Sequence, residues 1–129
     1  MKQSFRTVLL VLLLFVAVAG VSASGNSDKD YSDPVQLEAL IERQTEPYIL
    51  IDVRTAGEYN SGFIPTAVNI PHTEIAEKPP TDDLETLVIV YCQSGVRSGN
   101  AFRTLTKLGF QRVVDFGGVT NWRGDLDTP

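Results

Sequence analysis

The chain has 129 residues, of which 43% are hydrophobic, and its 16 acidic and 11 basic side chains give a net charge of −5 at pH 7. This length allows one domain with a single hydrophobic core, and the acidic balance argues against nucleic acid as a partner. The one cysteine, Cys92, excludes an intramolecular disulfide and leaves a thiol that is free, bonded to another chain or chemically active.

The N-terminal segment has the pattern of a secretory signal. Lys2 and Arg6 precede an apolar run over residues 8–18, and Val21-Ser22-Ala23 matches a cleavage site. We therefore expect a signal peptide over residues 1–23 and a periplasmic or otherwise exported protein. An uncleaved membrane anchor is the alternative, although the apolar stretch is shorter than the roughly 20 residues that usually span a bilayer. Membrane contact is expected only in that case.

The remaining chain is predicted to form a leader and one domain. Residues 24–32 are polar and lack periodicity, which predicts a flexible leader before a domain over residues 33–129. In chain order, the predicted elements are a helix capped by Asp33, a strand over 48–53, a short helix that Thr55 starts and Ser61-Gly62 ends, strands over 67–70 and 87–91, a helix from about Gly99 that Lys107 and Gly109 close, and a strand over 112–116.

The alternation of short apolar strands and short helices predicts the fold class. It indicates an α/β domain with a mostly parallel sheet of four to five short strands and helices on both faces. In such sheets ligands bind beyond the carboxyl ends of the strands, and both Asp52 and Cys92 fall at strand ends. We expect Asp52 to be a structural hydrogen-bond acceptor that pairs with Arg54 or with the cysteine loop, rather than a reacting group.

The residues after Cys92 suit a negatively charged sulfur. If the segment from Gln93 to Ser98 curls around the thiol, its successive amides point inward and form an anion-binding nest, with Gly95 supplying a positive φ. Ser98 is predicted to cap the following helix, whose N-terminus would further lower the pKa of the thiol. Arg97 is expected to face the loop and hold an anion, the alternative being an ion pair with a surface carboxylate.

Two kinds of chemistry use such a loop, phosphoryl transfer to cysteine and sulfur transfer to cysteine. Cysteine-dependent phosphatases place more residues between the cysteine and the arginine than the four found here between Cys92 and Arg97. A tighter ring favours the smaller sulfane sulfur, so a phosphatase or arsenate reductase is the less favoured hypothesis. Arg54 and Glu58 are spaced as a surface ion pair on a helix.

Several motifs together resemble those of single-domain rhodaneses, in particular the small periplasmic rhodaneses of the phage-shock type. The stretch Cys92-Gln-Ser-Gly-Val-Arg-Ser98 resembles their active-site loop. The other matching segments are residues 50–55, Glu58-Tyr59, residues 64–71, and Gly117-Gly118 with Trp122. Two departures from the family pattern lie in the turn before the second strand, where Phe63 replaces a common histidine and Thr66 replaces a glycine.

The resemblance implies a rhodanese-like fold and a thiosulfate-type sulfurtransferase. Cys92 would be the catalytic nucleophile that takes the outer sulfur of thiosulfate as a persulfide and passes it to cyanide or a thiol. The substrate-binding residues would be Gln93, Ser94, Gly95, Val96, Arg97 and Ser98, with Asp52 and Arg54 in support. We expect no metal, no organic cofactor and a monomer. A sulfur carrier or rhodanese-like binding module that delivers sulfur to a protein partner is the alternative.

Overall fold

The computed structural model describes residues 29–129. Its elements are α1 (Pro34–Arg43), β1 (Tyr48–Asp52), α2 (Ala56–Asn60), β2 (Val68–Asn69), β3 (Leu87–Cys92), α3 (Val96–Lys107), β4 (Arg112–Gly118) and the 3-10 helix η1 (Val119–Asn121). The predicted signal peptide over residues 1–23 lies outside the described residues. Within the described part of the chain, no helix has the length and apolar character needed to cross a bilayer.

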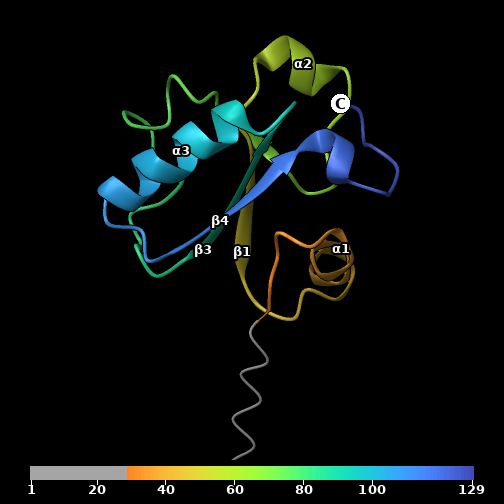
Figure 1. The fold of residues 1–129 in the computed structure, drawn as a ribbon, viewed down its shortest axis with the longest axis horizontal. Helices are drawn as coiled ribbons and strands as arrows, with labels where there is room; N and C mark the ends of the chain where they lie inside the picture. The colour runs from red at the N-terminus through yellow and green to blue at the C-terminus, as the bar shows by residue number, and fades with distance from the viewer. Residues whose placement is uncertain (1–28) are drawn as a thin grey trace, which may run out of the picture.

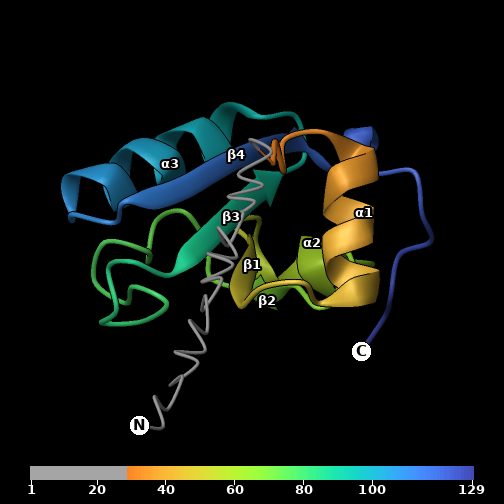
Figure 2. The same ribbon diagram turned by 90° about the horizontal axis from the view of Figure 1, so that it is seen from below.

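The four strands form one parallel sheet in the order β2-β1-β3-β4; Figure 1 labels β1, β3 and β4, and Figure 2 labels all four. This arrangement confirms the predicted α/β class and the parallel sheet. The register pairs Asp52 of β1 with Tyr91 of β3, and Cys92 of β3 with Gly118 of β4. Because the strands run in the same direction, the sheet gathers these residues at its carboxyl edge, where ligands bind in open α/β sheets.

Helices cover both faces of the sheet, as predicted (Figure 2). On one face, Leu37 and Leu40 of α1 belong to a core cluster with alternate residues of β3 such as Ile89. On the other face, Ala101 and Leu105 of α3 pack in a second cluster with the intervening strand residues. Every residue of β3 is buried. A strand covered on both faces explains the continuous apolar run from which β3 was predicted.

The start of the domain differs from the prediction. The flexible leader was expected to reach residue 32, but Tyr31 is 4% exposed and belongs to the α1-side core cluster. Its hydroxyl donates to Glu46 at 2.6 Å, and the amide of Asp33 donates to the carbonyl of Asp30 at 3.0 Å. The prediction is therefore wrong for residues 29–32, because an aromatic ring that packs on the core orders the chain ahead of the first helix.

The α1 helix begins where the sequence predicts. The Asp33 carboxylate accepts hydrogen bonds from the amides of Val35 and Gln36 at 2.9 and 3.1 Å, and Pro34 occupies the first helical position. The second predicted strand is shorter than expected, with only Val68 and Asn69 paired to β1.

Candidate active site

Cys92 ends the central strand β3 and is completely buried. The chain turns back over the sulfur immediately after it, and the amide of Gly95 donates to Sγ at 3.0 Å. Gly95 has φ +102°, a backbone conformation that favours glycine. The predicted curl around the thiol is therefore present, and it depends on the glycine that the sequence placed there.

The helix after the loop begins earlier than predicted. It starts at Val96, with Gly95 as its N-cap, and not near Gly99. Ser98 is consequently inside the first turn and does not cap the helix, so that part of the prediction is wrong. Its buried hydroxyl donates to the carbonyl of Gly95 at 3.1 Å and lies 3.6 Å from Cys92 Sγ. The early start brings the positive end of the α3 dipole next to the sulfur.

The surroundings of Cys92 favour its thiolate. Burial by itself raises the pKa of this thiol, because the charged form loses its water. Hydrogen bonding acts in the opposite direction and lowers the pKa, first through the Ser98 side chain and then through the amides of Ser98, Gly95 and Ser94. The donors outweigh burial, and the pKa of Cys92 lies below its ordinary value. The loop therefore stabilises a nucleophilic thiolate in a buried position.

The two glycines at the end of β4 lie directly against the cysteine loop. A side-chain Cβ at Gly118 would lie 2.8 Å from the carbonyl oxygen of Gln93 and 3.3 Å from Cα of Ser94. Gly117 has φ +87°, and its carbonyl oxygen lies 3.4 Å from the Ser98 hydroxyl. The two adjacent glycines thus let β4 approach the cysteine loop more closely than any other residues would allow.

A buried ion pair lies beside the loop at the end of β1. Arg54 donates to the carboxylate of Asp52 through Nη2 at 2.6 Å and through Nε at 3.0 Å to each oxygen. The Arg54 amide and the Tyr91 hydroxyl also donate to this carboxylate, both at 2.9 Å. Asp52 is completely buried and Arg54 is 5% exposed. The expected pairing of Asp52 with Arg54 is confirmed, and the carboxylate is fully used as a hydrogen-bond acceptor.

Arg54 connects this ion pair to the cysteine loop. Its Nη1 donates to Gln93 Oε1 at 3.3 Å, and its Nη2 also donates to the carbonyl of Gly62 at 2.6 Å. Burial tends to lower the pKa of Arg54, but the hydrogen bonds and charge of Asp52 raise it above its usual value. The guanidinium therefore stays charged and fixes Gln93, the first residue of the loop after the thiol.

Arg97, near the end of the cysteine loop, forms an ion pair with Glu58 of α2. Its Nη1 and Nη2 donate to the two Glu58 carboxylate oxygens at 2.7 and 2.9 Å. The hydrogen bonds that Arg97 donates to Glu58 are the main reason that its pKa is raised. Desolvation lowers the pKa, and the charges of Glu58 and Cys92 raise it further. Of the two predicted partners of Arg97, an anion held by the loop and a surface carboxylate, the structure thus shows the carboxylate. The charge of Cys92 also contributes to the raised pKa of Arg97.

Sequence reasoning missed Glu58 as part of this site. The expected surface pair between Arg54 and Glu58 is wrong, because Arg54 precedes α2 and turns inward to Asp52. The signal that places Glu58 is the capping box with Thr55, whose hydroxyl accepts from the Glu58 amide at 3.3 Å while its own amide donates to the carboxylate at 3.0 Å. That box fixes Glu58 in the first turn of α2, beyond the carboxyl end of β1.

The outer side of the loop is uncharged. Gln93, Ser94 and Val96 are exposed, and Val96 is 71% exposed although it is apolar. The loop residues 92–98 thus contribute one cation, Arg97, and that cation is paired. Within residues 29–129, no group of three or more His, Cys, Asp or Glu side chains is placed to hold a metal ion.

The two residues that depart from the family pattern lie in the turn before β2. Phe63 stacks on Tyr59 with ring centroids 4.3 Å apart, and its backbone exchanges hydrogen bonds of 2.9 Å with Asp127. Thr66 has φ +73° and lies 2.9 Å, oxygen to oxygen, from the Tyr48 hydroxyl. Thr66 therefore adopts a conformation in which glycine is favoured, and Phe63 is anchored by its stacking and backbone pairing.

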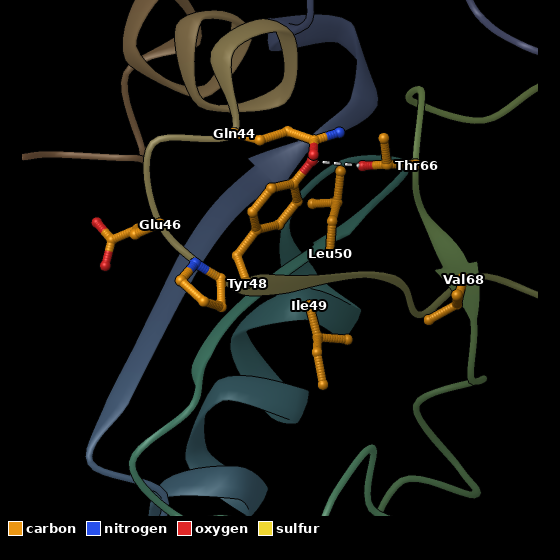
Figure 3. Close-up of a pocket in the computed structure, with 8 residues that line it drawn as sticks. Gln44, Glu46, Tyr48, Ile49, Leu50, Thr66 and Val68 are labelled. Atoms are coloured by element: carbon orange, nitrogen blue, oxygen red, sulfur yellow. Dashed lines mark hydrogen bonds between the residues drawn. The ribbon is translucent and has the colours of Figure 1, made fainter.

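A groove of about 500 Å³ lies elsewhere on the molecule (Figure 3). It borders the beginning of β1 at Tyr48 and Leu50, and Thr66 and Val68 line its other side. Cys92 ends β3, whereas Tyr48 pairs with the first residue of that strand, Leu87. The groove is therefore separate from the cysteine loop and contributes no residue to it.

Comparisons with known proteins agree with this geometry. A family model described as Rhodanese-like domain matches residues 33–125. The chain is 34% identical over 91 residues to a protein named Sulfurtransferase from Allochromatium vinosum, covering 68% of this chain and 85% of that protein. It is 37% identical over 71 residues to Thiosulfate sulfurtransferase PspE of Escherichia coli (strain K12), covering 54% of this chain and 68% of PspE.

A solved structure described as a rhodanese with anions from E. coli superposes with a TM-score of 0.56 at 30% identity. The superposition covers 64% of this chain and 99% of that chain. Together with the matched family model, this similarity confirms the predicted fold. The names of these relatives support sulfur transfer in general as the activity of the chain.

Proposed function

The chain belongs to the family of rhodanese-like domains, and from this premise we propose that it is a thiosulfate-type sulfurtransferase acting through a persulfide on Cys92. The Cys92 thiolate attacks the outer sulfur of thiosulfate. The sulfur–sulfur bond of the donor breaks, and its electron pair leaves with sulfite. Cyanide or a thiol then takes the outer sulfur of the persulfide and returns Cys92 to the thiolate.

The observation that carries this proposal is the hydrogen bond from the Gly95 amide to Cys92 Sγ at 3.0 Å. An amide aimed at a buried sulfur favours negative charge there, and the Ser94 and Ser98 amides act in the same sense. Both resting forms of the proposed cycle, thiolate and persulfide, are anionic. Fixed donors of this kind stabilise charge without having to reorganise during the reaction.

The rest of the loop has supporting roles in the proposal. Arg54 holds Gln93 in place, and Ser94 and Val96 form the exposed outer side of the loop that the donor approaches. Arg97 attracts the anionic donor electrostatically, and its pairing with Glu58 weakens that attraction. Asp52 acts through Arg54 by keeping the guanidinium in place.

Intact-mass spectrometry tests the proposal directly. Incubation with thiosulfate should add one sulfur, about 32 Da, to the wild-type protein, and cyanide should then remove it. Cys92→Ser should show no adduct under the same conditions. Absence of the adduct in wild type, or its presence in Cys92→Ser, would contradict the proposal.

The same measurement bears on the acceptor and on export. Discharge of the persulfide by cyanide or by a small thiol at the rate of sulfur loading supports an enzyme with small acceptors. Slow discharge to every small acceptor, with rapid discharge to one protein, would instead identify a sulfur carrier.

We further propose that the protein is exported and cleaved after Ala23, and the mass of protein recovered from the exported fraction reports that cleavage.

A further inference from the structure

The one positive charge within the cysteine loop, residues 92–98, is already paired with a carboxylate. Arg97 donates through both terminal nitrogens to both oxygens of Glu58, at 2.7 and 2.9 Å. Paired hydrogen bonds between arginine and carboxylate are among the stronger and more directional ionic contacts in proteins. The two side chains are 26% and 34% exposed, so the pair is partly open to solvent.

Glu58 is held in this position by its own helix as well as by Arg97. Its Oε2 accepts the amide of Thr55 at 3.0 Å and the hydroxyl of Thr55 at 2.9 Å. These bonds belong to the capping box that begins α2. The carboxylate is therefore fixed beside the loop by contacts that do not depend on whether Arg97 is engaged with a donor.

The neighbouring loop side chains offer no replacement for the lost charge. Gln93, Ser94 and Val96 are exposed and uncharged. A donor that approaches the cysteine loop meets a thiolate and an ion pair whose charges cancel. The repulsion between the thiolate and the donor grows in proportion to the donor's own charge.

We propose that Glu58 is a positioning residue that sets donor specificity, because by holding Arg97 it disfavours dianionic sulfur donors relative to singly charged ones. The inference deepens the proposed sulfurtransferase function and rests on it. Thiosulfate, with two negative charges, is then a weaker donor than the loop would otherwise make it. Singly charged donors that carry the same sulfane sulfur are penalised less.

Two donors of matched chemistry test this inference. Thiosulfate transfers its outer sulfur to Cys92 and releases sulfite, whereas methanethiosulfonate transfers the equivalent sulfur and releases methanesulfinate. In both reactions one sulfur–sulfur bond forms at Cys92, one breaks in the donor, and total charge is conserved. The donors differ by one negative charge, so the ratio of their loading rate constants cancels changes in the nucleophile itself.

Glu58→Gln is the informative variant, since glutamine can still complete a capping box but carries no charge. We expect the second-order rate constant for persulfide loading to rise on the order of tenfold with thiosulfate and about threefold with methanethiosulfonate, because Coulomb energy is proportional to charge. The ratio of the two constants should rise about threefold, and the gain should shrink at high salt, which screens exposed charges.

Two further variants separate a charge effect from a structural one. Glu42→Gln removes the charge of an exposed glutamate in α1 and should leave the donor ratio unchanged. The double variant Glu58→Gln with Arg97→Gln removes both members of the pair and should return the ratio to the wild-type value. If Glu58→Gln acts by disturbing the fold, loading from both donors becomes slower and the ratio of the two rate constants does not rise. That result would contradict the inference.

The outcomes distinguish the inference from the function on which it rests. If Cys92 loads sulfur from both donors but Glu58→Gln leaves their ratio unchanged or lowers it, the specificity role of Glu58 is wrong and the sulfurtransferase proposal stands. If neither donor loads Cys92 in the wild-type protein, both proposals are wrong. A ratio that rises equally at low and high salt would also contradict the inference, because it would exclude a charge effect.

Discussion

Replacing Asp52 by asparagine should destabilise the domain strongly, since it leaves a buried cation without its counter-charge. The Asp52 carboxylate is completely buried and receives Arg54 Nη2 at 2.6 Å, and Arg54 itself is 5% exposed. Breaking a buried ion pair from one side typically costs about 3–5 kcal/mol. That is a large share of the roughly 5–15 kcal/mol by which a domain is usually stable. At about 4–8 °C per kcal/mol, the melting temperature should fall by at least about 12 °C.

Urea denaturation followed by Trp122 fluorescence and circular dichroism measures this change. Arg112→Gln is the matched control, because it breaks an ion pair of similar length on the surface. Arg112 lies 2.7 Å from Glu46, against 2.6 Å between Arg54 and Asp52, and its side chain is 48% exposed. That variant should cost at most about 1 kcal/mol. A cost below about 1 kcal/mol for Asp52→Asn, or equal costs for the two variants, would refute the reasoning that burial makes this pair structurally important.

Three further predictions concern the loop and the turn before β2. Ser98→Ala removes the hydroxyl that most lowers the pKa of Cys92, so the midpoint of thiol alkylation against pH should rise; an unchanged midpoint contradicts this. Gly118→Ala places Cβ 2.8 Å from a loop carbonyl oxygen and should destabilise by about 1–3 kcal/mol, whereas Gly57→Ala, with open space around its Cβ, should be neutral or slightly stabilising in urea denaturation. Thr66→Gly should be more stable than Thr66→Ala by about 1–2 kcal/mol, because φ is +73° there; equal stability would exclude backbone strain at this position.

The fold was predictable because local signals and the overall architecture agree. The buried run that became β3 and the capping residues Asp33 and Thr55 each correspond to an element in the structure. The position of Cys92 at the carboxyl edge follows from strand order alone, and the positive φ of Gly95 from the need to turn back over the sulfur. Such features depend on a few neighbouring residues, which is why sequence patterns show them.

The missed features depend on contacts between distant segments. Glu58 and Arg97 are 39 residues apart, so predicting their pairing requires the relative positions of α2 and α3 in the fold. By sequence spacing the expected partner of Glu58 was Arg54. Arg54 instead pairs with the buried Asp52, because an exposed helical ion pair contributes little free energy. Tyr31 looked like part of a polar leader, since a single aromatic residue shows no periodicity that would indicate burial.

The central claim is that the folded loop stabilises negative charge on Cys92, and the pH dependence of alkylation tests it most directly. Iodoacetamide reacts with the thiolate, and the sequence has one cysteine, so the rate reports Cys92 alone. Because the folded pKa is lowered, thiolate stabilisation is fully present above the unfolded pKa of about 8.5 and is lost as pH falls through the folded value. The folded protein should therefore show a lower midpoint than the urea-unfolded chain. An equal or higher midpoint in the folded protein would contradict the claim.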